Sequence, residues 1–192
     1  MDPITETVNE SKNVDSRMNL VYAGRLDVDG GIDILLNVIP QVTCECDLVI
    51  TGSGPLKEKL LTYSNTNSKV KIDYRGFVSE EELNDILQRA DACLSMLRTD
   101  KAFSQKSFPS KVIKYLSYGN MVISSNVPAL SDLRDIFPNL LIYNDEEEFV
   151  RMIQEASFLA QKMNKIEQKK NFDDFYNKKR KELSDFFDAI SV

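Results

Sequence analysis

The chain has 192 residues, of which 42% are hydrophobic and 28% are charged. This is the usage of one ordinary globular domain, and it excludes a coiled coil, a collagen-like chain and wholesale disorder. The 30 acidic residues outnumber the 24 basic ones and give a net charge of -6, which argues against a partner of nucleic acids or anionic membranes. An anionic ligand would have to be bound by a local cluster of basic groups.

The residue types that are missing exclude several kinds of enzyme. The chain has no histidine, which removes Ser-His-Asp and Cys-His nucleophile activation and the commonest transition-metal ligand. Cys44, Cys46 and Cys93 form no CxxC pair, so we expect reduced, buried thiols and no metal site. Residues 1–17 are polar and lack the apolar segment of a signal peptide, and no run of 18 apolar residues occurs. We therefore expect a soluble, cytoplasmic protein.

From Asn19 onward, short apolar runs alternate with segments of helical periodicity. The apolar runs predict strands that are buried on both faces, at Leu20–Ala23, Cys46–Thr51, Val70–Tyr74, Ala92–Met96, Met121–Ser124 and Leu140–Tyr143. The periodic segments predict helices at Ile32–Val38, Leu56–Tyr63, Glu80–Ala90, Ser110–Tyr118, Ala129–Ile136 and Glu146–Lys162. The alternation predicts a doubly wound, Rossmann-like α/β fold with a parallel sheet of about six strands and helices on both faces.

Two segments lie outside this alternation. Residues 1–17 are interpreted as a polar leader or an interdomain linker, and residues 18–162 as the sheet domain. Residues 163–192 predict an amphipathic helix, because apolar side chains recur at intervals of three or four, at Phe172, Phe175, Tyr176, Leu183, Phe186, Phe187 and Ile190. This apolar face either packs on the same domain or docks on another domain or subunit.

The loops that follow the strands are where a ligand of this fold is expected, because helix N-termini point their amides outward there. Glycines in such loops let a phosphate or a ring approach the backbone closely. The candidates are Gly24-Arg25, the run Gly52-Ser53-Gly54-Pro55, the turn Gly76–Ser79, and Phe108–Lys111 ahead of the predicted fourth helix.

Taken in order, these loops and their flanks resemble one enzyme family. The matching stretches read VYAGRL at 21–26, DLVITGSGPLKEKL at 47–60, YRGFVSEEEL at 74–83, RADA at 89–92 and SFPSKVIKYLSYG at 107–119. They resemble the sugar-nucleotide-dependent glycosyltransferases of GT-B fold, group 1 (family 4) type, in a capsule-type variant with the SFPSK motif. The resemblance covers about Asn19–Asp145 and corresponds to the C-terminal, nucleotide-sugar-binding half of such an enzyme. The N-terminal half, which holds most of the acceptor site, is missing from this chain.

The resemblance implies roles for individual residues. Arg25 falls where the family places an arginine on the donor diphosphate; the alternative is a surface arginine paired with Asp27 or Asp29. Ser110 and Lys111 fall where family members present backbone amides and a side chain to phosphates. The Gly76–Ser79 turn resembles the segment whose backbone contacts the nucleobase, which would make Val78 a base-edge contact. The remaining donor-binding candidates are Gly24, Gly52, Gly54, Lys106 and Lys114.

The departures from the family pattern matter as much. Lys106 and Lys114 stand where many members carry two glutamates, the second of which accepts hydrogen bonds from the ribose, and Gly30 stands in place of a lysine. An ammonium group cannot accept from a diol, so the loss of two charge-assisted bonds would weaken ribose binding by ~3 to 6 kcal/mol. A positive cluster of Lys101, Lys106, Lys111 and Lys114 for the diphosphate would compensate; otherwise these lysines are solvated.

The sequence therefore predicts the donor-binding domain of a glycosyltransferase of surface polysaccharide synthesis, with a nucleotide-diphosphate sugar as substrate and no cofactor. Arg25 and Lys111 would stabilise the charge on the departing diphosphate, and the isolated chain would be inactive without its N-terminal domain. A partner domain or subunit would dock through the last helix, with membrane association only through that partner. The alternative is a non-catalytic, glycosyltransferase-like subunit that acts as a partner or regulator. A different GT-B enzyme, such as a sugar-nucleotide epimerase, is disfavoured by the absence of histidine.

Overall fold

The structure, a computed structural model, describes residues 17–63, 67–99 and 110–190, with side chains as far as Asp185. The predicted leader therefore lies outside the described residues, apart from Arg17. The described chain forms a parallel sheet of six strands in the order β3-β2-β1-β4-β5-β6. The strands are β1 (Met18–Ala23), β2 (Cys46–Thr51), β3 (Val70–Gly76), β4 (Ala92–Ser95), β5 (Met121–Ser125) and β6 (Leu140–Tyr143). This is the strand order of a dinucleotide-binding doubly wound fold, which confirms the predicted fold class.

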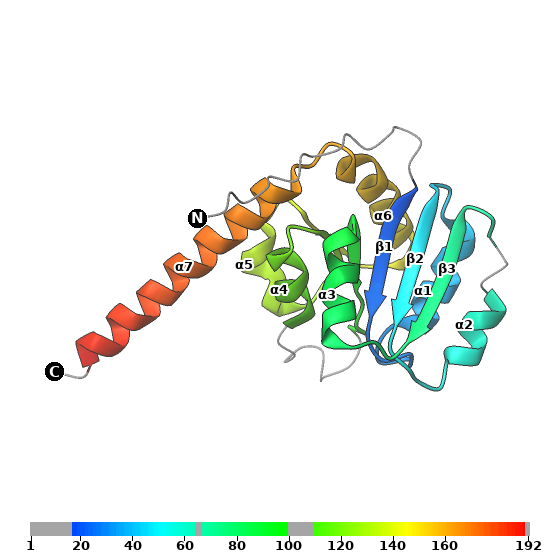
Figure 1. Cartoon of the computed structure of the whole chain (residues 1–192), viewed down its shortest axis with the longest axis horizontal. Helices are drawn as coiled ribbons and strands as arrows, with labels where there is room; N and C mark the ends of the chain where they lie inside the picture. Colours follow the sequence, from blue (N-terminus) through cyan, green and yellow to red (C-terminus); the bar gives the residue numbers. More distant parts are fainter. Residues whose placement is uncertain (1–16, 64–66, 100–109, 191–192) are drawn as a thin grey trace, which may run out of the picture.

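Helices cover both faces of the sheet (Figure 1). They are α1 (Ile32–Val38), α2 (Lys57–Tyr63), α3 (Glu80–Arg89), α4 (Ser110–Ser117), α5 (Ser131–Arg134), α6 (Glu146–Ala160) and α7 (Lys165–Ile190), with short 3-10 turns η1 (Ile39–Gln41) and η3 (Pro128–Leu130). Alternate residues of β1 point to opposite faces. Tyr22 belongs to a core that includes side chains of α1, α2 and α6, whereas Val21 belongs to a core that includes side chains of α3, α4 and α7. Each face thus has its own apolar core.

Two sequence expectations were wrong in detail. The third strand is not buried on both faces, because β3 is an edge strand and its charged residues Lys71, Asp73 and Arg75 alternate with partly buried ones. The helix expected over Ala129–Ile136 is a 3-10 turn followed by the four residues of α5. Pro128 begins the 3-10 turn. Phe137 precedes Pro138, and a residue before a proline avoids helical geometry, so the helix cannot continue through Phe137.

The first half of α7 packs on the sheet domain. Phe172 is buried with its ring centroid 5.9 Å from that of Phe137, and Phe175 meets Phe137 edge-on at 5.2 Å. The Lys165 ammonium donates hydrogen bonds to the carbonyl oxygens of Gln88 at 2.5 Å and of Ala90 at 2.9 Å, at the end of α3. These contacts answer the question left open by the sequence for this half of the helix.

The second half of α7 runs away from the body of the domain (Figure 1). Tyr176 and Leu183 are exposed, whereas the side chains of Phe186, Phe187 and Ile190 lie outside the described ones. No helix in the described part of the chain is both long enough and apolar enough to cross a membrane.

Candidate functional site

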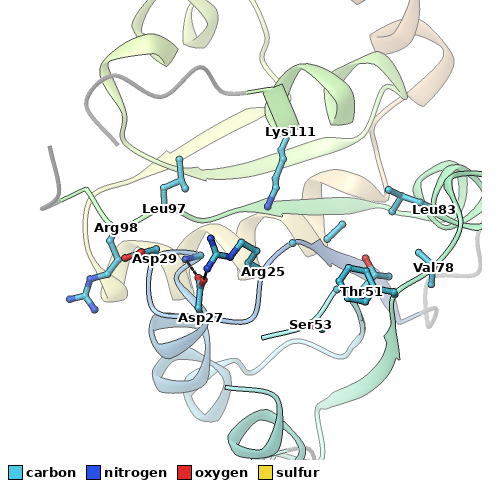
Figure 2. Close-up of a pocket in the computed structure, with 15 residues that line it drawn as sticks. Arg25, Asp27, Asp29, Thr51, Ser53, Val78, Leu83, Leu97, Arg98 and Lys111 are labelled. Carbon is cyan, nitrogen blue, oxygen red and sulfur yellow. Dashed lines mark hydrogen bonds and ion pairs between the residues drawn. The ribbon is translucent and has the colours of Figure 1, made fainter. Parts of the chain in front are cut away.

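A pocket of about 600 Å³ opens at the carboxyl ends of β1, β2 and β4. The strand order reverses here, since β1 pairs with β2 on one side and with β4 on the other. Loops from neighbouring strands diverge at such a point and leave a crevice in which ligands of this fold bind. The pocket is lined by Ala23, Gly24, Arg25, Asp27, Asp29, Gly30, Thr51, Gly52, Ser53, Phe77, Val78, Leu83, Leu97, Arg98 and Lys111 (Figure 2).

The β1–α1 loop forms one wall and is held in shape from both sides. The Tyr22 hydroxyl lies 2.7 Å from the carbonyl oxygen of Arg25 and 3.2 Å from that of Gly30, so it donates within this loop. The Asp27 carboxylate accepts a hydrogen bond from the Gly30 amide at 2.7 Å and forms an ion pair with Arg25 at 2.6 Å. The Arg25 side chain is 82% exposed, so its guanidinium remains open to a ligand.

Lys111 supplies a second cation from the opposite wall. It follows Ser110 in the first turn of α4, and its side chain extends from that helix into the pocket toward the β1–α1 loop (Figure 2). Its ammonium lies 5.5 Å from the centroid of the Tyr22 ring, in cation–π range. Desolvation by the surrounding protein lowers the pKa of Lys111, and the nearby Asp27 charge opposes that shift.

Glycines let the loops after β1 and β2 approach each other closely beside the pocket. A Cβ atom at Gly52, whose φ is 113°, would collide with the carbonyl oxygen of Gly24, and a Cβ at Gly54 would collide with that of Leu26. A Cβ at Gly24 would meet the ammonium of Lys111. The β1 and β2 loops can therefore approach each other, and Lys111 can reach the backbone, because these positions carry no side chain.

The far end of the pocket is apolar. Phe77 follows β3 and is 84% exposed, and it lines the pocket together with Val78 and Leu83. Ser79 caps the adjacent helix, since its hydroxyl accepts a hydrogen bond from the Glu82 amide at 3.1 Å, and this fixes the turn that carries Phe77 and Val78. The pocket thus combines cationic side chains with an apolar end.

Five of the sequence-predicted site residues line this pocket, namely Gly24, Arg25, Gly52, Val78 and Lys111. Gly54, Ser110 and Lys114 do not line it: Gly54 lies against Leu26, Ser110 begins α4, and Lys114 is half-buried in the last turn of that helix. Lys106, like Lys101, falls outside the described residues. Of the lysines in the expected positive cluster that the structure describes, Lys111 lines the pocket and Lys114 does not.

Sequence reasoning missed several lining residues. Asp27 was expected as a partner of Arg25 but not as a link to the loop backbone, and the Arg98–Asp33 ion pair at 2.6 Å was not foreseen. Phe77 stood inside a motif that was singled out, and an aromatic residue in the loop after a predicted strand was the signal that the sequence offered. In the described ranges, no three or more cysteine, aspartate or glutamate side chains are grouped so that they could hold a metal ion.

Comparison with known proteins identifies the family. The family model described as "Glycosyl transferases group 1" matches residues 17–170, which is most of the chain. This chain belongs to the group 1 glycosyltransferases. No curated protein sequence matches this group 1 glycosyltransferase chain significantly.

Solved structures share its fold at low sequence identity. The catalytic domain of cholesterol-alpha-glucosyltransferase from Helicobacter pylori is 19% identical, with a TM-score of 0.62 over 83% of this chain and 99% of that one. The lipopolysaccharide outer core galactosyltransferase WaaB is 22% identical, with a TM-score of 0.65 over 83% of this chain and 45% of WaaB. HepE from Anabaena, in complex with UDP and glucose, is 12% identical, with a TM-score of 0.58 over 84% of this chain and 48% of HepE. The group 1 chain thus spans less than half the length of WaaB and HepE.

Proposed function

We propose that this group 1 glycosyltransferase chain is the donor-binding domain of an enzyme that transfers a sugar from a nucleotide-diphosphate sugar to a saccharide or lipid-linked acceptor. The observation that carries the proposal is the convergence of Arg25 and Lys111 on one pocket at the strand reversal. They come from separate elements, and in a chain with a net charge of -6 they place two positive groups, beside the carboxylates of Asp27 and Asp29, where the fold binds ligands.

The donor diphosphate lies between these two cations in the proposed complex. Arg25 offers a planar fork with several donors, which suits two phosphate oxygens, and Lys111 offers a point charge. When the bond between the sugar and the diphosphate breaks, negative charge builds up on the leaving group. Cations that are fixed before the reaction stabilise this charge without a reorganisation cost, so the proposed mechanism is mainly electrostatic.

The nucleobase lies against the apolar end in the same complex. Phe77 and Val78 present apolar surface, and the backbone of the Gly76–Ser79 turn supplies polar groups for the base edge. The ribose would then lie between the base and the diphosphate. Lys114, which the resemblance aligns with a ribose-binding carboxylate, does not line the pocket and cannot accept hydrogen bonds from the ribose hydroxyls. We therefore expect weak ribose recognition in this chain.

Further features of the whole enzyme follow from the same proposal. A site of this kind is completed by a second domain, so the 192-residue chain by itself is expected to bind donor nucleotides without turnover. The second domain or a partner subunit would meet the exposed half of α7, around Tyr176 and Leu183. Surface polysaccharide synthesis in the cytoplasm, with no metal and no cofactor, is the setting that we propose.

Calorimetric titration with UDP, GDP, CMP and ADP tests the proposal. Binding of one of them in the micromolar to low-millimolar range supports a donor site and identifies its base. Arg25→Ala is expected to weaken that binding about tenfold or more, because a charge-assisted hydrogen bond contributes ~1.5 to 3 kcal/mol. Arg75→Ala is the matched control, because Arg75 is a charged residue of β3 that does not line the pocket.

The alternative function is a non-catalytic subunit whose donor pocket has lost its ligand. Lys114 is the observation that favours it, since it replaces the carboxylate expected for the ribose. Absence of binding to all four nucleotides, with binding restored in Lys114→Glu, would support this alternative. An Arg25→Ala variant that binds as tightly as the natural chain would contradict the proposed donor site.

A further inference from the structure

We propose that Asp27 is a positioning residue of this site, which aims the Arg25 guanidinium at the ligand by tying it to the loop backbone. This inference rests on the proposed donor site. It assigns a role to a carboxylate inside a pocket that is proposed to bind an anion, where a negative charge would otherwise be a disadvantage.

The two oxygens of the Asp27 carboxylate have different partners. Oδ1 accepts a hydrogen bond from the Gly30 amide at 2.7 Å, and Oδ2 pairs with Nη2 of Arg25 at 2.6 Å (Figure 2). Asp27 itself is 8% exposed, so its position is set by the protein around it. The Asp27 carboxylate therefore connects the long, flexible side chain of Arg25 to the backbone of Gly30.

Arg25 needs such a connection because, among the described residues, Asp27 is the group that forms an ion pair with its side chain. The Arg25 side chain is 82% exposed. A solvated arginine side chain samples many rotamers, so its guanidinium has no fixed position without a partner. Its backbone is already fixed, since the Arg25 carbonyl accepts from the Tyr22 hydroxyl at 2.7 Å. Asp27 supplies the corresponding constraint at the charged end, and a prearranged group loses less entropy when a ligand binds.

Asp27 also acts on the second cation of the pocket. Its charge favours the protonated form of Lys111, against the desolvation that disfavours it. Asp27 therefore acts on both cations in the free protein. It orients the Arg25 guanidinium, and its charge stabilises the protonated form of Lys111. When a diphosphate arrives, Arg25 can bind it with one part of its fork while Asp27 retains another.

The direction in which one substitution changes the affinity for the diphosphate separates this role from simple repulsion of the anion. Asp27→Asn keeps the size of the side chain and an oxygen for the Gly30 amide, but it loses the ion pair with Arg25. If Asp27 positions Arg25, Asp27→Asn binds the diphosphate about three- to tenfold more weakly than the natural chain. If Asp27 merely repels the anion, removal of its charge tightens binding. Asp29→Asn is the comparison variant, because it removes the same formal charge from an exposed carboxylate of the same pocket.

A second comparison separates positioning from general damage to the loop. In an Arg25→Ala background, Asp27→Asn is expected to cause no further weakening, since the group that it positions is gone. Damage to the loop would weaken binding in both backgrounds. The melting temperature of each variant shows whether it is folded at the temperature of the titration.

All variants are titrated with UDP, GDP, CMP and ADP in parallel, and the nucleotide that the natural chain binds gives the comparison. Weaker binding by Asp27→Asn that disappears in the Arg25→Ala background supports the inference. Binding by Asp27→Asn that equals or exceeds that of the natural chain overturns the inference and leaves the proposed function standing. If the natural chain and its Lys114→Glu variant bind none of the four, the proposed function fails and this inference fails with it.

Discussion

The Lys111 ammonium lies 5.5 Å from the centroid of the Tyr22 ring. The hydroxyl group of the same tyrosine donates toward the carbonyl oxygen of Arg25, so one buried residue contacts both cation-bearing walls of the pocket. The ring face attracts the Lys111 charge, and the hydroxyl fixes the backbone that carries Arg25. The geometry of the candidate site is therefore built on β1 before any ligand is present.

Tyr22→Phe tests this relationship. The substitution keeps the ring but removes the donor to the carbonyl oxygens of Arg25 and Gly30, so we expect a loss of about 1 kcal/mol in the free energy of unfolding. Urea denaturation measures it. Tyr115→Phe is the control, since the Tyr115 hydroxyl lies 3.4 Å from the Ala23 carbonyl oxygen, and the longer contact predicts a smaller loss. Equal losses would contradict the special position of Tyr22.

The pH dependence of diphosphate binding should report on Lys111. Burial lowers the pKa of this ammonium below its usual 10.5, so the group loses its charge at a lower pH than a solvated lysine does. We therefore expect the affinity for a nucleoside diphosphate to fall as the pH rises toward 10. Lys111→Arg should bind without this fall, because arginine keeps its proton throughout that range. An alkaline fall of the same size in Lys111→Arg would assign the titration to another group.

Gly52→Ala should damage the fold more than the same change at Gly76. Both residues have positive φ, 113° at Gly52 and 67° at Gly76, so an alanine is strained at either position. At Gly52 the added Cβ also collides with the Gly24 carbonyl, whereas at Gly76 the nearest atom is 3.8 Å away. We expect a loss of about 1 kcal/mol for Gly76→Ala and clearly more for Gly52→Ala in chemical denaturation. The reverse order would contradict the close approach of the two loops.

The two halves of α7 should respond differently to truncation of apolar side chains. Phe172 is 6% exposed and packs against Phe137, so Phe172→Ala should cost about 3 to 5 kcal/mol of stability. Leu183 is 56% exposed, and Leu183→Ala should change the stability by less than about 0.5 kcal/mol. Thermal denaturation of the two variants makes the comparison. A large loss at Leu183 would mean that a second copy or another surface covers this half of the helix.

Cys44 should be the most reactive thiol. All three cysteines are free, but Cys46 and Cys93 are buried and Cys44 is half-buried. A hydrogen bond from the neighbouring Cys46 lowers the pKa of Cys44 to about 7, and burial opposes that shift. Because the thiolate is the nucleophile, the rate of alkylation should rise between pH 6 and pH 8 and label one site per chain. Peptide mapping after iodoacetamide treatment identifies it, and Cys44→Ser should remove the label.

The sequence was sufficient for the fold because its strands are short apolar runs between turn residues. All six predicted strands occur within two residues of their expected ends, and the pairing of β1 with β4 follows from the doubly wound pattern. It was less informative for β3, because an edge strand alternates in burial, and sequence alone does not state which strand is at the edge. Short helical elements such as α5 depend on local prolines more than on periodicity.

The candidate site was predictable only in its motif residues. Arg25, Lys111 and the loop glycines stand in recognisable stretches after strands or at a helix start. Arg98, in contrast, pairs with Asp33 from a distant part of the chain. The Arg25–Asp27 pair was a stated possibility, but the bond from the Gly30 amide to Asp27 depends on the conformation of the β1–α1 loop. For Lys114 the sequence was informative about the residue type but not about its position relative to the pocket. The resemblance set Lys114 in place of a ribose-binding carboxylate, but its position outside the pocket lining depends on the packing of α4.

The most direct test of the proposed donor site is a crystal structure of the chain grown with the nucleoside diphosphate that it binds best in calorimetry. We expect both phosphorus atoms between Arg25 and Lys111, beside Gly24, with the base against Phe77 and Val78. A nucleotide bound elsewhere, or one whose phosphates avoid both cations, would contradict the assignment of this pocket as the donor site.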